Sequence, residues 1–452
     1  MWNQQLIEKY NISGPRYTSY PTALQFEENF GQTDFERAIS ALPQNQGISL
    51  YIHIPFCTTL CNYCACNKIV TKNKQRAVEY LEYLYLEIER MGKMLNNQKV
   101  KQIHFGGGSP TYLSDQQMAQ LLNHLDSHFN LAKENQQFAI EIDPRSLGEN
   151  SLDVFNTLGF NRISIGIQDF NHDVQVAINR VQSEALTRSI INRARELQFN
   201  SINVDLIYGL PLQSVESFRE TIDTIIDIRP DRISLFNYAH LPHRFKPQRR
   251  IVSDDLPCAA TKLEIFRQSI EQLTDAGYLY IGMDHFALPS DELAKAQQNK
   301  CLQRNFQGYT PSEENTIIGL GVSAISHVLG CYSQNQRDLY DYYESIDQGE
   351  LAIWRGCYSD EDDIIRKTVI MELICHFQLD MRSIENHFDI KFAKYFATEL
   401  QSLKSLEQDG LITINQDLIK VTDVGRLLVR NVCMVFDAYL GGIQINSYSQ
   451  AI

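Results

Sequence analysis

Between residues 48 and 287 the chain alternates short apolar segments with longer segments of helical spacing. The short segments are rich in β-branched and aromatic residues and predict strands over 48–55, 100–107, 138–144, 162–170, 202–211, 232–240 and 278–287. The intervening spacing predicts helices, among them 77–95, 185–199 and 262–277. Such alternation is typical of βαβ units around a parallel sheet, and the number of units predicts an α/β fold with a full or partial (β/α) barrel.

Several predicted strands end in polar or glycine-rich segments: GGGSP, EIDP, QDF, DLIYGLP and NYAH. In parallel α/β folds, ligands bind beyond the carboxyl ends of the strands. These segments therefore predict a binding site on one rim of the sheet.

The barrel segment is flanked by two regions of different character, so we predict three parts: an N-terminal arm or substrate lid over 1–47, the barrel over 48–345, and a C-terminal domain over 346–452. The arm contains GPRYTSYPTA (14–23), which has neither helical nor strand periodicity. The last part is mainly helical, with helical stripes at 364–374 and 392–403, a β-hairpin at 410–422 and a further helix from Asp423. This winged-helix-like pattern leaves nucleic-acid binding open, although packing or closure over a substrate is the interpretation we favour.

The charge balance decides against nucleic acid and anionic lipid as partners. The 452 residues contain 41 Lys and Arg against 55 Asp and Glu, for a formal net charge of -14. Such a surface repels phosphate groups. No apolar run reaches the ~18 residues that a membrane span needs, and the N-terminus lacks the pattern of a secretory signal. We therefore expect a soluble, cytoplasmic protein.

Ten cysteines are present, and four of them fall within ten residues: Cys57, Cys61, Cys64 and Cys66. The other six stand alone, and we expect them to be small buried hydrophobic residues. A disulfide framework would require a small secreted fold, which this chain does not resemble.

CTTLCNYCAC (57–66) places three cysteines at C-x3-C-x2-C just after the first predicted strand. A zinc site usually draws four ligands from two separated pairs, and no second pair follows. A redox dithiol would leave Cys57 unexplained. Thiolates also hold [4Fe-4S] clusters, normally through four cysteines, so three would leave one iron open to another ligand.

This loop, followed by GGGSP (106–110) after the second predicted strand, resembles the radical S-adenosylmethionine (SAM) enzymes. The resemblance implies a [4Fe-4S] cluster whose open iron chelates SAM, and one-electron cleavage of SAM to methionine and a 5'-deoxyadenosyl radical. It also implies that the glycine run lies close to SAM, where a Cβ atom would block the backbone.

A narrower resemblance extends along the whole chain, to the oxygen-independent coproporphyrinogen III oxidases (dehydrogenases). It rests on the blocks KYNISGPRYTSYPTA, YIHIPFC, CxCNKIVT, HFGGGSPTYL, IEIDPR, NRISIGIQDFN, VDLIYGLP, FNYAHLP, GMDHFA, RNFQGYT and GVSAIS, with Ser109 where the family usually has Thr. It implies oxidative decarboxylation of the ring A and B propionates of coproporphyrinogen III to vinyl groups. The product is protoporphyrinogen IX, a step of haem biosynthesis, and two SAM molecules are consumed per turnover.

The resemblance also assigns residues to the cofactors. It implies that Cys57, Cys61 and Cys64 ligate the cluster, whereas Cys66 does not. The SAM on the cluster would be held by Tyr51, Gly107, Glu141 and Ile325. The second SAM would be held by Tyr63, Gly108, Ser109, Gln168, Arg180, Asp205 and Ala239.

Substrate and partner assignments also follow from the resemblance. Five residues in shared blocks are candidates for binding the anionic porphyrinogen: Arg16, Tyr17, His285, Arg304 and Asn305. No side chain is assigned as the chemical catalyst, because the radical comes from SAM. We expect an electron donor such as flavodoxin or ferredoxin, and a monomer.

Three other functions fit parts of the sequence. A radical SAM haem chaperone and a haem-modifying methyltransferase would share the cluster loop but would not be expected to keep the GPRYTSYPTA arm, and a chaperone typically lacks a cysteine at position 66. A redox-sensing winged-helix regulator would need a basic recognition helix, and none stands out in the sequence.

Overall fold

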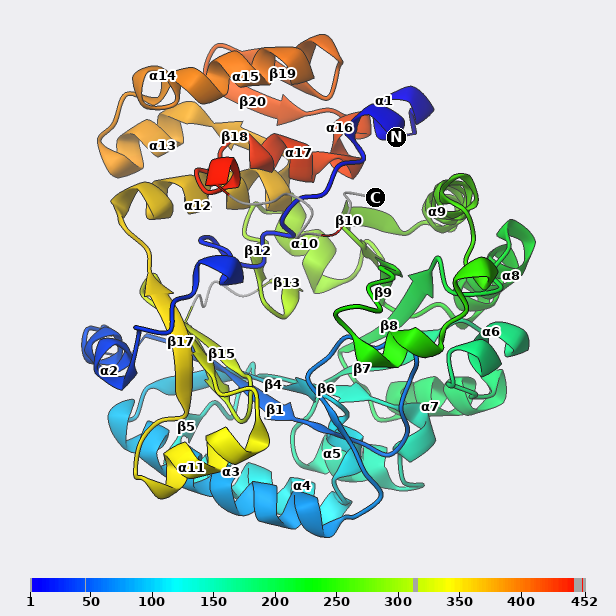
Figure 1. The fold of residues 1–452 in the computed structure, drawn as a ribbon, viewed down its shortest axis with the longest axis vertical. Helices are drawn as coiled ribbons and strands as arrows, with labels where there is room; N and C mark the ends of the chain where they lie inside the picture. Colours follow the sequence, from blue (N-terminus) through cyan, green and yellow to red (C-terminus); the bar gives the residue numbers. More distant parts are fainter. Residues whose placement is uncertain (1, 45, 312–315, 443–448, 450–452) are drawn as a thin grey trace. The chain divides into compact units, whose positions relative to one another are not determined.

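The computed structural model describes residues 2–44, 46–311, 316–442 and 449 (Figure 1). The chain divides into two compact units that are each discontinuous in sequence. One unit comprises residues 26–276 and 314–358, and the other comprises residues 1–25, 277–313 and 359–452. The three-part division predicted from the sequence stays a prediction, and the compact units follow different boundaries.

The first unit is built on a mixed sheet with the strand order β9-β8-β7-β6-β4-β1-β14-β15-β16-β17. The first seven strands in this order, which run from β9 through β8, β7, β6, β4 and β1 to β14, are parallel to one another. Their bounds are β1 Ile48–Ile54, β4 Lys99–Gly107, β6 Gln137–Ile142, β7 Arg162–Gln168, β8 Ser201–Tyr208, β9 Arg232–Asn237 and β14 Ile317–Leu320. The predicted partial (β/α) barrel is confirmed.

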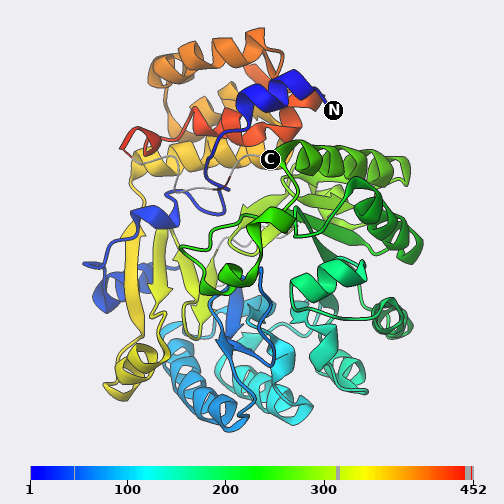
Figure 2. The same cartoon turned by 45° about the vertical axis from the view of Figure 1, so that its right-hand side comes forward.

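Helices lie along the outside of this sheet (Figure 2). Their bounds are α3 Gln75–Met94, α4 Asp115–His128, α5 Ser151–Thr157, α6 His172–Ala177, α7 Glu184–Glu196, α8 Val215–Ile228 and α9 Ala259–Asp275. Local sequence sets their starts: Ser114 and Ser214 form capping boxes that satisfy free backbone N–H groups. Ile52 of β1, Phe105 of β4 and Ile165 of β7 are fully buried beneath these helices.

An antiparallel extension of the sheet was not predicted. It consists of β15 Ile325–Val328, β16 Cys331–Asn335 and β17 Ile353–Tyr358, with α11 Leu339–Asp347 between the last two. The segment Gln32–Ser40, which we placed in the arm, forms α2 in this unit. Two short strands, β2 Phe56–Cys57 and β3 Ile69–Val70, bracket the cysteine loop, and β5 Asn130–Leu131 pairs with β4.

The second unit is mainly helical, with α1 Gln4–Tyr10, α10 Glu292–Gln298, α12 Glu361–His376, α13 Met381–Phe388, α14 Phe392–Tyr395, α15 Ala397–Gln408, α16 Asp423–Leu427 and α17 Val429–Met434. Val369, Ile370 and Leu373 of α12 form part of its core. The predicted hairpin at 410–422 is present as β19 Ile412–Asn415 and β20 Leu418–Val421, and β18 Gln378–Asp380 joins it. None of the described helices is both long enough and apolar enough to cross a membrane.

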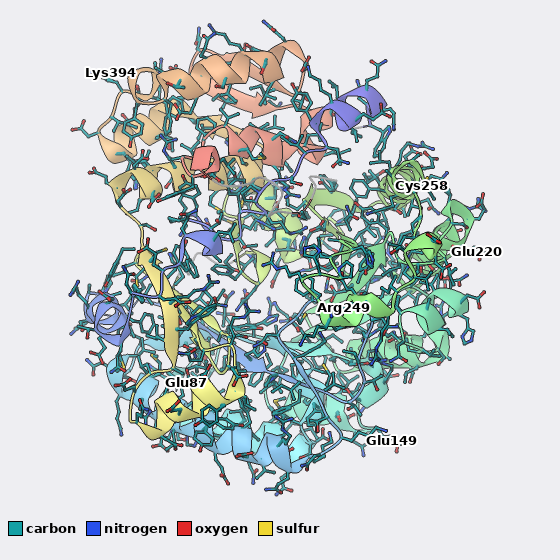
Figure 3. All side chains as sticks on the ribbon, viewed as in Figure 1. Glu87, Glu149, Glu220, Arg249, Cys258 and Lys394 are labelled. Atoms are coloured by element: carbon teal, nitrogen blue, oxygen red, sulfur yellow. The ribbon has the colours of Figure 1, made fainter. Side chains whose placement is uncertain are left out.

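Four details of the prediction were wrong. The segment 278–287 forms the antiparallel hairpin β10 Leu279–Gly282 and β11 His285–Ala287, because Gly282 and Met283 adopt positive φ values that reverse the chain. The apolar stripe at 392–403 is split into α14 and α15, since Phe396 leaves helical geometry. Ile364 faces solvent with 42% of its surface exposed. Cys258 is exposed at the start of α9 (Figure 3), so not every isolated cysteine is a core residue.

The unit also contains the hairpin of β12 Gln303–Asn305 and β13 Gly308–Thr310. Arg304 on β12 and Tyr309 on β13 stand directly opposite in the ladder, with the Arg304 guanidinium 4.6 Å from the centre of the Tyr309 ring. The hairpin thus holds a cation against an aromatic face.

Candidate active site

The cysteine loop is held at its start and in its middle. At its start, Cys57 of β2 pairs with Val70 of β3. In its middle, the Asn62 amide donates to the Ala177 carbonyl (2.9 Å), and the Asn179 amide donates to the Leu60 carbonyl (2.7 Å). The loop is therefore tied to the end of α6 rather than left as a free surface segment.

A cavity of about 370 Å³ opens beside this loop at the carboxyl ends of β4, β6, β7 and β8, within the first unit. The parallel register brings residues far apart in sequence to this rim, as expected for the fold. The residues predicted to bind the cluster or SAM that line the cavity are Cys57, Cys61, Tyr63, Cys64, Gly107, Gly108, Ser109, Glu141, Gln168, Arg180 and Asp205.

Three predicted cofactor residues are not part of this lining. Tyr51 is on β1, and its ring stacks on the His104 ring with centroids 5.8 Å apart. Ala239 lies in the chain after β9, where the Gln248 amide joins the carbonyls of Ala239 (3.2 Å) and Tyr63 (3.0 Å). Ile325 begins β15, and its backbone abuts Gly319.

The glycine run has a structural reason in addition to cofactor access. A Cβ atom on Gly107 would lie 2.7 Å from the His53 ring, and the backbone there has φ +118°. A Cβ atom on Gly108 would lie 2.7 Å from the backbone of Pro55. Real Cβ atoms do not approach other atoms so closely, so side chains are excluded where β4 passes the end of β1.

Two arginines converge on the Cys61 sulfur. Arg145 Nη2 lies 3.4 Å and Arg180 Nη1 lies 3.7 Å from Cys61 Sγ. Asp143 bridges them, 2.7 Å from Arg145 Nη2 and 3.4 Å from Arg180 Nη1. Burial alone would raise the pKa of Asp143, but the hydrogen bond from Arg145 and the charge of Arg180 lower it overall. The carboxylate is therefore held ionised beside two cations.

Asp143 and Arg145 were not predicted as site residues, although both lie in the IEIDPR block. The sequence feature that could have identified them is their position at the carboxyl end of a predicted strand of the parallel sheet. The 3-10 helix Pro144–Ser146 turns Arg145 back so that its guanidinium bonds the Asp143 carboxylate and faces Cys61.

The thiols of the loop differ in acidity. Burial raises the pKa of Cys57 to about 12. A hydrogen bond with the Cys66 side chain lowers the pKa of Cys64 to about 6. Lys68 Nζ donates to the backbone carbonyls of Cys64 (3.2 Å) and Cys66 (3.4 Å), adding positive charge nearby. Metal binding must replace the thiol protons, and the neighbouring cations favour the thiolate form.

The cavity lining also includes the carboxylates of Glu141 and Asp205. Glu141 Oε2 accepts from the Gly107 N–H (3.2 Å), and its Oε1 lies 3.1 Å from His104 Nε2. Asp205 accepts from Asn203 Nδ2 (2.8 Å) and Ser164 Oγ (3.1 Å). Burial, together with the nearby charge of Glu141, raises the pKa of Asp205 to about 6.

Gln168, which lines the cavity, lies where the backbone of β7 is irregular. A register shift between Gly166 and Gln168 interrupts the pairing of β7 with β8, and Gln168 has φ 73°. Bulges and positive φ values of this kind re-aim side chains next to functional sites, at a cost in backbone strain.

The five predicted substrate residues all lie in the second unit. Arg304 Nε donates to the Arg16 carbonyl (3.2 Å), and the His285 ring packs edge-on against Tyr309, which faces Arg304. Asn305 ends β12 and accepts from the Gln307 N–H. Arg16 forms an ion pair with Asp284.

Tyr17 differs from the other four because it is buried and its hydroxyl donates to Asp437 (3.0 Å). Its contact with a substrate stays a prediction, and its observed role is to attach the N-terminal segment to the C-terminal part of the same unit.

Comparisons with known proteins identify the family to which this chain belongs. A family model described as the radical SAM superfamily matches residues 51–225, and one described as the HemN C-terminal domain matches residues 360–428. The chain is thus a radical SAM protein, in agreement with the cysteine loop at the mouth of a partial barrel.

The chain belongs to the oxygen-independent coproporphyrinogen III oxidase family. It is 50% identical to the Pseudomonas aeruginosa enzyme of that name over 100% of this chain and 99% of the relative. The Escherichia coli enzyme is 48% identical over 97% of this chain and 96% of its own. A solved structure of the Escherichia coli coproporphyrinogen III oxidase, described as a radical SAM enzyme, matches with a TM-score of 0.94 and 47% identity, covering 97% of this chain and 99% of that one.

The residues present fit the cofactors that radical SAM enzymes use, a [4Fe-4S] cluster and SAM. Three thiols from one short loop line a single cavity, which is a donor set suited to iron. Arg180 has a buried Nε atom without a hydrogen-bond partner among the described residues, on the wall of that cavity. A carboxylate-bearing ligand would satisfy such a donor.

Proposed function

We propose that this chain is an oxidoreductase that converts coproporphyrinogen III to protoporphyrinogen IX by oxidative decarboxylation of the ring A and B propionates. The observation that carries the proposal is the cysteine loop on the cavity, in a chain that matches the family over its full length. When bound, the cluster and SAM supply reductive cleavage of SAM and a radical that abstracts hydrogen.

The chain's own residues then have defined tasks. We propose that Cys57, Cys61 and Cys64 hold the cluster, while Arg145 and Arg180 offset negative charge at Cys61. Because both guanidiniums are bridged by Asp143, they are held in place before any ligand arrives. Such preorganised positive charge would stabilise a negatively charged cluster without rearrangement of the side chains.

We propose that the polar cavity wall orients SAM. Asp205 and Glu141 present carboxylate oxygens that can accept from ribose hydroxyls or an ammonium group, and Arg180 can pair with a carboxylate. Tyr51, Tyr63, Gly107, Gly108, Ser109, Gln168, Ala239 and Ile325 complete the proposed set.

The anionic substrate needs cations in this acidic chain. We propose that Arg16, His285, Arg304 and Asn305 receive its carboxylates. Arg304 supports this role because its Nη1 atom is buried without a partner among the described residues. Its Nε atom is fixed by the Arg16 carbonyl, so the free end of the guanidinium is held in one direction.

The proposal is tested anaerobically with reconstituted cluster, SAM, a low-potential reductant and coproporphyrinogen III. We expect protoporphyrinogen with about two 5'-deoxyadenosines per product, because the cofactor chemistry is used once for each propionate. Deoxyadenosine without a vinyl product would contradict the substrate assignment, and a haem-binding titration would then follow.

We further propose a cytoplasmic enzyme that takes electrons from an acidic carrier protein, such as a flavodoxin or ferredoxin. All ten cysteines are free, as in a reducing compartment.

Residues 58–76 carry four basic side chains and no acidic one, although the chain's net charge is -14. Exposed Lys72 and Lys74 lie just after Val70, which pairs with Cys57 and is 41% exposed. A basic segment beside the cluster loop favours encounter with an acidic donor.

Reversing the charge of Lys72 is expected to weaken use of a protein donor. With an acidic flavodoxin, Lys72→Glu should raise the KM for the donor roughly fivefold. The attraction between Lys72 and the acidic donor at the edge of the docking surface becomes a repulsion. With dithionite as the reductant, activity should stay at the level of the unchanged protein. Lys93→Glu, an exposed lysine on α3, is the matched control and should leave both assays unchanged. Equal KM values for the two variants would contradict docking at this segment.

SAM binding is expected to strengthen as the pH rises through about 6. The ionised form of Asp205 is the hydrogen-bond acceptor, and its pKa in the folded protein is about 6. Below that pH the carboxyl is protonated and must lose a proton on binding, so affinity falls. The SAM dissociation constant, measured from pH 5 to 8, should lose most of this pH dependence in Asp205→Asn. An unchanged profile in the variant would show that another group titrates.

A further inference from the structure

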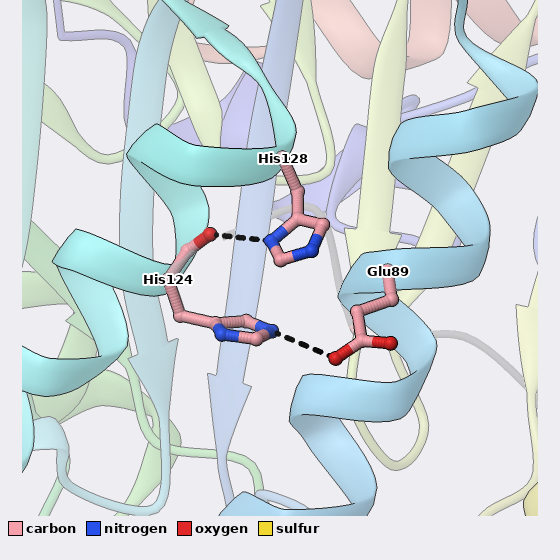
Figure 4. A group of neighbouring side chains, drawn as sticks. All are labelled: Glu89, His124 and His128. Atoms are coloured by element: carbon pink, nitrogen blue, oxygen red, sulfur yellow. Dashed lines mark hydrogen bonds and ion pairs between the residues drawn. The ribbon is translucent and has the colours of Figure 1, made fainter.

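A second cluster of metal-ligating side chains lies between α3 and α4, apart from the cavity lining. It consists of Glu89 on α3 and of His124 and His128 on α4 (Figure 4). The three side chains point toward one another, and their ligand atoms all lie within 4.8 Å of one another. His124 Nε2 is 3.8 Å from Glu89 Oε1.

The helix geometry explains why these residues meet. His124 and His128 are four residues apart, so they share one face of α4, and their ring centroids are 4.4 Å apart. Gly92 lies one turn beyond Glu89 on α3, and a Cβ atom there would be 2.6 Å from the His128 carbonyl oxygen. The glycine therefore lets the two helices approach closely enough for Glu89 to reach His124.

One histidine is already oriented as a ligand. His128 Nδ1 lies 2.9 Å from the His124 carbonyl oxygen, so Nδ1 carries the proton and Nε2 keeps its lone pair. A hydrogen bond from the second ring nitrogen to a carbonyl is the usual support of a metal-bound histidine. His124 is held differently: its ring packs on Tyr85 at 4.5 Å, and its Nε2 is 3.2 Å from the Tyr85 carbonyl oxygen.

We propose that Glu89, His124 and His128 bind a divalent transition-metal ion of the Zn²⁺ type that bridges α3 and α4. Two imidazoles and one carboxylate match the ligand types and number of three-ligand zinc sites, and water would complete the tetrahedron. Bonds of about 2.1 Å in a tetrahedron require ligand atoms roughly 3.4 Å apart, so the side chains must close by about 0.4–1.4 Å. The ring proton of His124 would move from Nε2 to Nδ1, so the imidazole stays neutral. Mg²⁺ and Ca²⁺, which prefer oxygen ligands, are not expected to bind.

The test uses the holoenzyme with its cluster intact, titrated anaerobically with ZnCl₂ in competition with a chromophoric chelator of micromolar affinity. We expect one equivalent of zinc to leave the chelator, and a rise in the melting temperature with added zinc. His124→Gln and His128→Gln should each lower the affinity more than tenfold and abolish that rise. His172→Gln, an exposed histidine on α6, is the matched control and should behave as the unchanged protein.

Free cluster thiols could also take up zinc, so Co²⁺ is used as a second probe. Binding at the proposed site should give d–d bands without thiolate charge-transfer absorption, and this result holds whether or not the enzyme acts on coproporphyrinogen III. Zinc that stays entirely with the chelator would overturn the proposal. So would equal zinc affinity of the His124→Gln/His128→Gln double variant, or cobalt bands of thiolate origin alone.

Discussion

Cys57→Ala is expected to abolish product formation and to prevent assembly of a stable cluster. Three cysteines supply all of the proposed protein ligands, so removing one leaves too few thiolates to hold a cubane with one open iron. Cys57 is half-buried at the end of β2, and alanine fits there without displacing its neighbours. Iron content, visible absorbance and deoxyadenosine release measure the effect, and each should fall to background.

Two cysteine variants serve as comparisons for Cys57→Ala. Cys258→Ala changes an exposed thiol just before α9, outside the cavity lining, and should retain cluster and activity. Cys66→Ala should retain the cluster, because Cys66 lines the cavity but is not one of the proposed ligands. A Cys57→Ala protein with full iron content, or a Cys66→Ala protein without a cluster, would show that the ligand assignment is wrong.

Glu87→Ala is expected to destabilise the first unit by about 3–5 kcal/mol. Glu87, whose side chain is labelled in Figure 3, belongs to α3. Only 2% of its surface is exposed. Its carboxylate accepts from the Gly321 N–H, the Asn335 amide and the Tyr342 hydroxyl, each at 2.7 Å. Alanine would leave these three buried donors without their partner. The carboxylate thereby ties α3 to the chain between β14 and α11.

Urea unfolding of the Glu87→Ala protein, monitored by circular dichroism, measures this effect as a lower midpoint. Glu82→Ala is the matched control, because Glu82 is exposed on the same helix and should shift stability by no more than about 0.5 kcal/mol. Glu87→Gln should fall between the two, since its amide keeps one acceptor oxygen but turns an N–H₂ toward a donor. Equal midpoints for the Glu87→Ala and Glu82→Ala proteins would contradict the role of this network.

The local pattern of the sequence was sufficient for the parallel part of the fold. Strands β1, β4, β6, β7, β8 and β9 all begin within one residue of their predicted starts. Their alternation with amphipathic helices leaves few other ways to bury both faces of the sheet. The antiparallel strands β15 to β17 were missed because none of them carries a strict alternation of apolar and polar residues, and β15 and β16 are also short. The turn at Gly282 and Met283 was missed because a positive φ at methionine has no sequence signal.

The sequence by itself determined the family, the cofactors and the proposed cluster ligands, because these depend on cysteine spacing and short motifs within single segments. Only the tertiary structure decided that Arg145 and Arg180 converge on Cys61 and share Asp143. It likewise brought Glu89 to His124 and His128 from a neighbouring helix. These groups come from separate elements, and their distances are set by strand register and helix packing rather than by any local pattern.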